Sequence, residues 1–501
     1  MSVLKKFAGQ TMIYGMSTII ARLLYFVMTP LYVNKYPPAS YGVVTQMYAW
    51  ASMINAILAF GMETTFFRYL QKVEEKDKPK VFSNSFIVIA VLAVLFFVTA
   101  FIFAGTIGTW LKKGEYSADF ERYVKYFALI LAMDALAVVP FAKLRSEGRP
   151  IQFGVIKLAN IGIMVSLNLF FIMLVPYLIN QGGTFGAWCS GWYRDEWIGY
   201  IFISNIVASA VTLLLLLPQM KGFSFRPEKQ LILKMLSYST PILIANISYI
   251  INENLDKIVL PMYLPKDVGD QDLGIYGAVG KLAMFLSIFV QAFRLGAEPF
   301  FFSYSKNANA KKTYAIIMEY FVIVMMLVML GITANIDWLK YFIKGKDEVT
   351  RELYWSGLFI VPLLLFNYVL LGIYMNLSVW YKLSDQTRYA LYISLVGAGI
   401  TIVANYYLIP KYSYVGAAIV TFLAYFSMVV LSYIWGQKNY PIPYKLGKIL
   451  LYIVTGILFS YLSYFVFQHN VFIGNGLLMV YIVGVFLMER NQLKQFIRKR
   501  A

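Results

Sequence analysis

The chain has 501 residues, of which 60% are hydrophobic and only 14% are charged, and its mean hydropathy is +0.65. These values exclude a soluble protein, because apolar runs long enough to cross a bilayer as helices recur along the whole chain. The net charge of +19 does not indicate nucleic-acid binding. Most lysines and arginines lie in short polar segments between the apolar runs, where they serve as an orientation signal.

Several kinds of chemistry are excluded by what the sequence lacks. Cys189 is the only cysteine and His469 the only histidine, so there is no intrachain disulfide and no Cys/His metal centre. The sequence has no Gly-x-x-x-x-Gly-Lys-Ser/Thr loop for nucleotide phosphates. We therefore expect no metal, no cofactor and no enzymatic activity, and we interpret His469 as a residue of the membrane interface.

The apolar runs predict fourteen membrane spans. The first run follows Lys5 and Lys6 and continues to Val33, which is too long for the core of a signal peptide, so we expect it to be retained. The predicted spans, in chain order, are 8–33, 41–67, 82–104, 120–142, 151–177, 197–217, 237–264, 274–300, 314–336, 355–376, 388–409, 414–436, 448–467 and 472–488.

The distribution of cations predicts the orientation. If the N-terminus lies in the cytoplasm, that side of the membrane carries 27 of the 44 lysines and arginines, the other side carries 12, and five lie within spans. Loops on the cytoplasmic side carry the excess of positive charge in membrane proteins. Both termini are therefore predicted to be cytoplasmic.

One motif occurs twice. Residues 61–69 read GMETTFFRY and residues 296–304 read GAEPFFFSY, and both fit Gly-x-Glu-x-x-Phe-Phe-x-Tyr. In each copy a Tyr-Gly pair lies 19 residues upstream, glycine to glycine (Gly42 and Gly277), and a Pro-x-Tyr precedes that pair. Three matches in the same order, about 235 residues apart, predict a duplicated membrane protein.

The predicted fold class is an all-α polytopic membrane protein with about fourteen transmembrane helices. Six spans in each copy give both copies the same orientation, so the two lobes form a parallel repeat with a substrate route between them. The predicted divisions are an N-terminal lobe at 1–217, a cytoplasmic linker at 218–236, a C-terminal lobe at 237–436, two additional helices at 437–489 and a basic cytoplasmic tail at 490–501.

Charged residues within spans are candidate functional residues, because a charge inside the bilayer is costly. Arg22 lies near the middle of span 1, on a stripe of polar or small residues that falls within an arc of about 80°. The stripe indicates the wall of a wet cavity with a cation at its centre. The alternative is an arginine paired with an acid of a neighbouring span, which only holds the bundle together. The stripe comprises Thr11, Gly15, Thr18, Arg22, Tyr25 and Thr29.

Span 7 carries a second polar cluster. Asn246, Glu253 and Lys257 lie within about 40° of one another, and Asp256 flanks them. We interpret them as facing a cavity, with an intrahelical ion pair between Glu253 and Lys257 as the alternative.

The remaining charges within spans are mostly cations. A cationic cavity suits an anionic head group, because arginine and lysine both bind phosphate. The candidate cavity cations are Arg22, Lys157, Lys257, Lys281 and Arg294. The candidate coupling or cavity-lining polar residues are Asp134, Asn246, Glu253 and Asp256. The repeated Gly61, Glu63, Gly296 and Glu298 are interpreted as structural, with each glutamate in a helix cap or in a salt bridge between hairpins; ion coupling is the alternative.

The longest predicted exterior loop, 180–197, is rich in tryptophan. Trp188, Trp192 and Trp197 most simply belong to an aromatic belt at the interface, with sugar stacking as the alternative. Arg194, Asp195 and Glu196 form the only exterior charge cluster that a membrane enzyme would use.

Several of these features together resemble one family. Fourteen spans, twin six-span halves, Arg22 in span 1, and the sequence NENLDKIVLPMYL (252–264) followed by LGIYG (273–277) resemble bacterial polysaccharide-unit flippases. These flippases belong to the MOP superfamily, which also holds MATE drug exporters and lipid II flippases. The resemblance covers essentially the whole chain. It implies two lobes around a cationic cavity, with Arg22 as the span-1 cation and Lys281 or Arg294 as cations of span 8.

The resemblance also implies a function. The substrate would be a polyprenyl-diphosphate-linked oligosaccharide, moved from the cytoplasmic to the periplasmic leaflet of the bacterial inner membrane by alternating access. The product would serve O-antigen, capsule or exopolysaccharide synthesis. The expected ligands are this substrate and membrane lipids, polymerase machinery is a candidate partner, and no nucleic acid is involved. The alternatives are a MATE-like drug or cation antiporter, a lipid II flippase, and a membrane polysaccharide polymerase or ligase.

Overall fold

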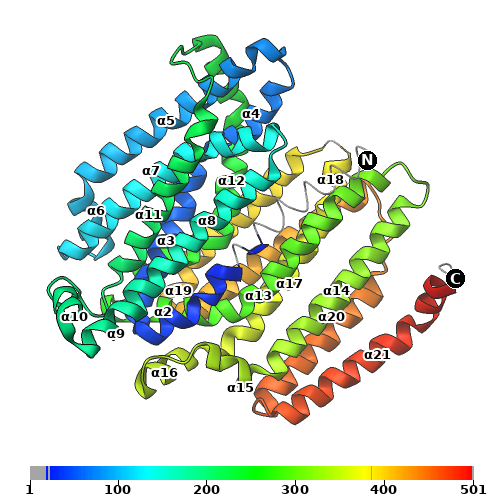
Figure 1. Cartoon of the computed structure of the whole chain (residues 1–501). Coiled ribbons are helices and arrows are strands. Elements are labelled where there is room, and N and C mark those ends of the chain that lie inside the picture. Colours follow the sequence, from blue (N-terminus) through cyan, green and yellow to red (C-terminus); the bar gives the residue numbers. More distant parts are fainter. Residues whose placement is uncertain (1–18, 21–22, 385, 499–501) are drawn as a thin grey trace. The chain divides into compact units, whose positions relative to one another are not determined.

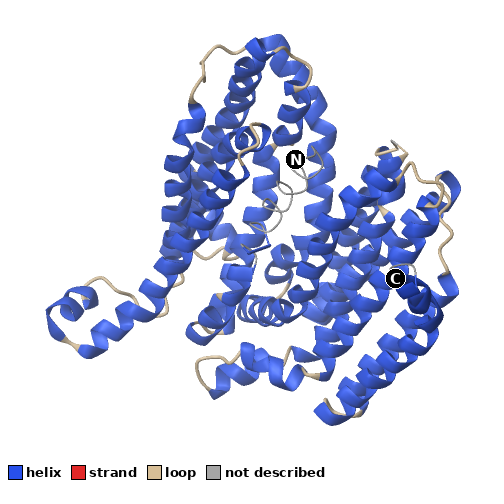
Figure 2. Ribbon diagram, turned by 45° about the vertical axis from the view of Figure 1, so that its right-hand side comes forward, coloured by secondary structure: helices blue, strands red, loops and turns tan. Residues whose placement is uncertain are grey.

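The computed structural model describes residues 19–20, 23–384 and 386–498 (Figure 1). Helices account for 86% of the residues, and no strand occurs within these ranges (Figure 2). The all-α polytopic fold class is therefore confirmed. The chain divides into two compact units, Met1–Gly274 and Ile275–Ala501. The lobe boundaries that the repeat suggested, 1–217 and 237–436, stay a prediction.

Twelve segments of the described chain are long and apolar enough to cross a bilayer. Eleven of them each correspond to one predicted span, and the twelfth, Arg388–Asn439, contains predicted spans 11 and 12. The twelve segments thus account for thirteen of the fourteen predicted spans. Half of predicted span 1, including Arg22, lies outside the described residues.

The N-terminal unit is a bundle in which α3, α5, α7, α8, α11 and α12 are the long helices (Figure 1). Helix α7 packs against α5, α8 and α11, and α12 packs against α3 and α4. The helices of this unit are α2 (Thr29–Lys35), α3 (Pro38–Ala59), α4 (Met62–Leu70), α5 (Lys78–Ile102), α6 (Ala104–Leu111), α7 (Ala118–Ser146), α8 (Pro150–Leu169), α9 (Val175–Gln181), α10 (Gly183–Ser190), α11 (Gly199–Leu216) and α12 (Lys229–Tyr263).

Interlocking aromatic rings form the core of this unit. The ring of Phe127 on α7 lies 4.8 Å from that of Phe202 on α11 and 5.4 Å from that of Tyr48 on α3, centroid to centroid. Both pairs are edge-to-face, the geometry that aromatic quadrupoles favour. These contacts fix the helices that carry the polar groups described below.

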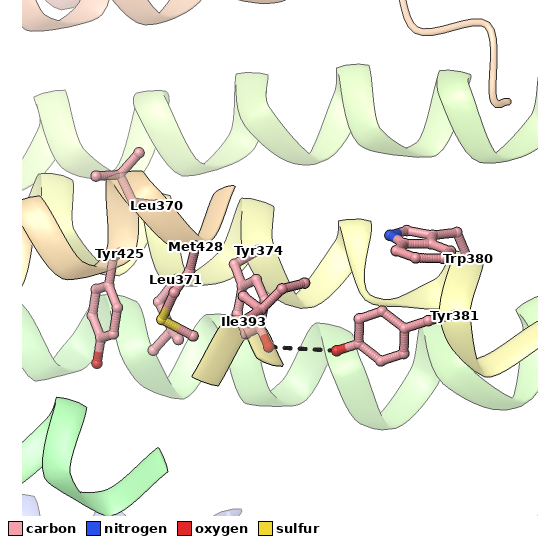
Figure 3. Close-up of a cluster of buried hydrophobic side chains, with 8 residues drawn as sticks. All are labelled: Leu370, Leu371, Tyr374, Trp380, Tyr381, Ile393, Tyr425 and Met428. Carbon is pink, nitrogen blue, oxygen red and sulfur yellow. Dashed lines mark hydrogen bonds between the residues drawn. The ribbon is translucent and has the colours of Figure 1, made fainter. Parts of the chain in front are cut away.

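The second unit contains the rest of α13 and the C-terminal helices. Its core includes a cluster on α17, α18 and α19 (Figure 3), in which Trp380 is 1% exposed and Tyr374 OH lies 3.5 Å from Tyr381 OH. The helices are α13 (Lys266–Tyr304, which begins in the first unit), α14 (Ala310–Ala334), α15 (Ile336–Leu339), α16 (Glu348–Trp355), α17 (Val361–Leu377), α18 (Val379–Leu383), α19 (Arg388–Asn439), α20 (Leu446–Tyr461) and α21 (Val471–Arg498).

Large apolar side chains cover the outer faces of both units. On α5, Val94 and Leu95 are 57% and 60% exposed, and on α21 Val480 and Leu487 are 59% and 61% exposed. Water would not stabilise continuous apolar faces of this kind, whereas lipid does. Helix α21 continues to Arg498, so the predicted basic tail (490–501) begins as a helical extension of the last span.

Two hairpins turn with almost no loop, and they are built alike. Inside α19, Ser413 has φ +49° and separates the helices of predicted spans 11 and 12. A Cβ atom on Gly416 would lie 2.5 Å from the main-chain oxygen of Leu408. In the first unit, Gly183 has φ +83°, and a Cβ on Gly186 would lie 2.4 Å from the main-chain oxygen of Leu178. The first turn joins α9 to the short helix α10, ahead of predicted span 6, whereas the second joins predicted spans 11 and 12 directly.

We expect Gly416→Ala to lower the thermal unfolding midpoint of the purified protein. The added methyl group overlaps a main-chain atom, and overpacking of this kind costs about 1–3 kcal/mol. Gly399→Ala is the matched control on the same helix, because nothing lies within 4 Å of its added Cβ. Equal midpoints for the two variants would show that the hairpin does not require glycine.

Candidate functional site

A set of polar side chains lies inside the N-terminal unit, among helices α7, α8 and α11. Ser209 Oγ on α11 donates a hydrogen bond to Asp134 Oδ1 on α7 at 2.8 Å. Asn160 Nδ2 on α8 donates to Thr212 Oγ1 on α11 at 2.8 Å. The predicted Asp134 is therefore an acid held by a hydroxyl donor within a span, where a carboxyl group requires such a partner.

The polar stripe of span 1 reaches the same region. Tyr25 lies close enough to Asp134 and Tyr48 to interact with them electrostatically. The hydroxyl of Tyr48 on α3 also accepts a hydrogen bond from Asn205 Nδ2 on α11 at 3.3 Å. Tyr25, one of the two residues of the stripe that the structure describes, thus lies near the acid of span 4. Arg22, the central residue of the prediction, lies outside the described residues.

Lys157 on α8 is a cation of this region. Its Nζ lies 4.4 Å from the centre of the Phe141 ring on α7, which is a cation–π contact. It also interacts electrostatically with Asp134. The structure therefore brings together the predicted cation of span 5 and the predicted acid of span 4, together with one hydroxyl donor.

Helix α12 separates the polar residues of predicted span 7 onto two faces. Asp256 is 4% exposed, and its Oδ1 lies 3.2 Å from Lys257 Nζ. The same ammonium donates to the main-chain oxygen of Glu253 at 2.6 Å. Asn246 is exposed, whereas Asn252, which the sequence prediction left out, is 3% exposed. The cation of this cluster therefore has an acidic neighbour on its own helix.

In the second unit, the candidate cations lie on α13. Arg294 Nε lies 3.4 Å from Glu298 Oε2, and Lys382 Nζ on α18 lies 2.7 Å from Glu298 Oε1. Glu298 thus bridges two cations, one on its own helix and one beyond the end of predicted span 10. The predicted Lys281 is half-buried on the same helix.

The first copy of the repeat contains the same kind of ion pair. Glu63 on α4 pairs with Arg145 at the end of α7, 82 residues away in the sequence. The pair of Glu298 and Lys382 in the second copy has almost the same separation, 84 residues. Each pair joins two helical hairpins, which is the geometry of the predicted structural role. That role itself stays a prediction.

The glycines of the two motifs differ. Gly61 has φ +63° and separates α3 from α4, whereas Gly296 lies within the continuous helix α13. A side chain at Gly61 would also approach Ile242 on α12 within 3 Å. The backbone break therefore belongs to the first copy only.

The exterior charge cluster is tied to the fold. Both guanidinium nitrogens of Arg194 lie 2.9 Å from the carboxylate oxygens of Asp119, and Trp197 Nε1 donates to the same carboxylate at 3.3 Å. The hydrogen bonds to Asp119 raise the pKa of Arg194 above its usual value. Asp195 pairs with Lys35. Arg194 and Asp195 thus anchor the loop to α7 and α2, which is not an arrangement that an enzyme site requires.

Three charged residues are absent from the sequence predictions. Glu319 on α14 and Glu489 on α21 are each 1% exposed, and both contact Lys448 on α20. Glu319 stands inside predicted span 9, so a charge within an apolar run was the signal that could have identified it. Glu489 directly follows predicted span 14, where sequence alone suggests an ordinary interfacial residue.

Comparison with known proteins identifies the family. The sequence matches the family model described as "Polysaccharide biosynthesis protein" over residues 7–305, which is more than half of the chain. The chain belongs to this family. A second family model, MatE, matches residues 241–407. No curated protein matches the sequence significantly.

Several solved transporter structures have the same fold as this chain. The lipid II flippase MurJ in an inward closed conformation has a TM-score of 0.67 at 13% identity, over 96% of this chain and 100% of that one. An inward-facing multidrug resistance MATE transporter of the MOP superfamily gives 0.63 at 15% identity, over 84% and 97%. A MOP superfamily transporter from Pyrococcus furiosus gives 0.52 at 15% identity, over 85% and 93%. The expected membership of the MOP superfamily is confirmed.

We expect Glu298→Lys to lower the thermal unfolding midpoint, because it places a third cation beside Arg294 and Lys382. The double variant Glu298→Lys/Lys382→Glu should recover part of the loss, since it restores an attractive pair. The single variant should lose about 1 kcal/mol of unfolding free energy, as for other partly exposed ion pairs. Glu348→Lys, which disrupts an exposed pair with Arg351, is the control. If the double variant is no more stable than the single one, the bridge between hairpins does not stabilise the fold.

Proposed function

We propose that this protein is a flippase for a polyprenyl-diphosphate-linked oligosaccharide used in surface-polysaccharide synthesis. The observation that carries the proposal is the family-model match over residues 7–305. The likeness to solved MOP-superfamily transporters supports a multi-pass transporter rather than an enzyme. The substrate would pass from the cytoplasmic to the periplasmic leaflet of the bacterial inner membrane by alternating access.

The charges within the spans support a diphosphate substrate. The candidate cavity residues, leaving aside the repeat motif, comprise five cations and three acids, and arginine and lysine are the side chains that hold phosphate oxygens. In the described structure, Lys257 lies beside Asp256 and Arg294 lies beside Glu298. A diphosphate that bound either cation would compete with the carboxylate beside that cation. The cations thus keep a counter-charge when no substrate is bound.

The topology and partners of the proposed flippase follow from the sequence. In the proposed topology both termini would lie in the cytoplasm, which the excess of lysine and arginine on that side supports. Membrane lipids surround the apolar faces, and the product would pass to polysaccharide polymerase machinery on the other side.

Complementation tests the proposal. The gene is deleted, surface polysaccharide is measured, and Arg22→Ala is compared with Arg22→Lys and wild type at equal protein level. We expect Arg22→Ala to abolish most of the polysaccharide, with lipid-linked units accumulating on the cytoplasmic leaflet, and Arg22→Lys to retain part of it, because lysine keeps the charge but loses the fork of donors. The control Arg351→Ala removes an arginine that pairs with the exposed Glu348, and it should behave as wild type.

Two outcomes would contradict this account. Full activity of Arg22→Ala would mean that Arg22 does not bind substrate. Unchanged polysaccharide in the deletion strain would overturn the flippase function itself.

A drug or cation antiporter is the second candidate, favoured by the MatE match and by the half-buried acid Asp134 within a span. An antiporter would make the deletion strain sensitive to cationic drugs, and Asp134→Asn would fail to restore resistance because the group that carries the exchanged ion is lost. As a flippase, the protein should leave drug sensitivity unchanged. Growth inhibition by a panel of cationic dyes, measured beside polysaccharide levels, decides between the two.

A further inference from the structure

A buried charged cluster lies where α14, α20 and α21 pack together, a helix from the second unit and the two helices beyond the repeat (Figure 1). Glu319 on α14 and Glu489 on α21 are each 1% exposed. Lys448 on α20, with a side chain 17% exposed, contacts Oε1 of both carboxyl groups. One ammonium group therefore serves two carboxyl groups from two other helices.

Among the side chains that the structure describes, the other titratable groups in contact with the cluster are one lysine and three tyrosines. Tyr452 OH donates a hydrogen bond to Glu489 Oε1, and Tyr481 OH donates to the main-chain oxygen of Tyr452 at 3.1 Å. Tyr320 is the neighbour of Glu319 on α14 and interacts with both carboxyl groups. Lys445 Nζ lies 3.8 Å from Glu319 Oε2, but its side chain is 55% exposed.

The charges do not balance inside the cluster. Two ionised carboxylates and the one partly buried ammonium of Lys448 leave an excess of one negative charge. Lys445 lies at the rim, where solvent screens its charge. Glu489 Oε2 is buried and has no hydrogen-bond partner among the described residues. A buried negative charge without a partner is costly, and two like charges beside one another add to that cost.

We propose that Glu319 and Glu489 form a proton-binding pair, in which one proton is held by the two carboxyl groups and Lys448 neutralises the charge that remains. The proton gives the pair a single negative charge, which one ammonium matches. It also supplies a donor for Glu489 Oε2, which otherwise has none among the described residues.

The site joins proton binding to the docking of α20 and α21. These helices lie beyond the repeat, and Lys448 and Glu489 are contacts that hold them to α14. Loss of the proton at high pH leaves an extra buried charge, so the packing should weaken as the pH rises. This inference does not depend on the proposed substrate, because no residue of the cluster belongs to the candidate site.

Infrared spectroscopy of the purified full-length protein tests the proposal through the carbonyl stretch of a protonated carboxyl group. We expect the wild type to show this absorption at neutral pH, and Glu319→Gln and Glu489→Gln each to lose one carboxyl equivalent of it. Lys448→Met should gain absorption, because without the ammonium both carboxyl groups must bind a proton. Glu348→Gln, at an exposed ion pair, should leave the spectrum unchanged.

Three results would overturn the proposal. The first is a carbonyl region that is the same in the wild type and both glutamine variants, since both carboxyl groups would then be ionised. The second is an absorption that appears only when sodium is replaced by choline, which would assign the site to a metal cation. The third is no gain in Lys448→Met. Gel filtration identifies variants that do not fold, and a pH titration of the wild-type absorption gives a readout that needs no variant.

Discussion

A charge placed among membrane spans needs a partner, and this requirement organises both units of the protein. Asp134 has Ser209, Lys257 has Asp256, and Glu298 has two cations. A partner within the protein replaces the water that the charge would otherwise lose. Because these partners sit on different helices in several cases, the same contacts that remove the charge penalty also fix which helices pack together.

This arrangement bears on how a charged substrate could be moved. A cation that is already paired need not be stripped of water when a phosphate group arrives, because one acidic partner is exchanged for another. The affinity for the phosphate group is then the difference between two strong interactions, that of the cation with phosphate and that of the cation with its own carboxylate. It therefore allows release as well as capture, which a carrier requires.

The positions of the membrane spans could be predicted from the sequence, because a long apolar run in a bilayer has few alternatives to a transmembrane helix. Even the division between spans 11 and 12 falls at Ser413, within the gap left between 388–409 and 414–436. Pairing between side chains could not be predicted in the same way. Glu298 and Lys382 lie far apart in the sequence, on different helices, and no local pattern links them.

Helical periodicity predicts which residues share a face of a helix, but it does not predict whether that face is buried or exposed. It places Asn246 with Glu253 and Lys257, yet the structure exposes Asn246 and buries Asn252 and Asp256. An arc on a helix can be calculated from the sequence, but the neighbour that covers the arc depends on other helices. Glu319, by contrast, could have been identified from the sequence, because it is a charged residue inside an apolar run.

The two glutamate–cation pairs show what the two halves of the predicted duplication have in common. The pairs of Glu63 and Glu298 join residues that are 82 and 84 positions apart, whereas the backbone break at Gly61 belongs to the first copy alone. The cation is Arg145 in the first pair and Lys382 in the second, so the carboxylate is the constant member. Arginine and lysine both carry the positive charge, but only arginine offers a planar fork of donors. The two links therefore depend on charge and not on one donor geometry.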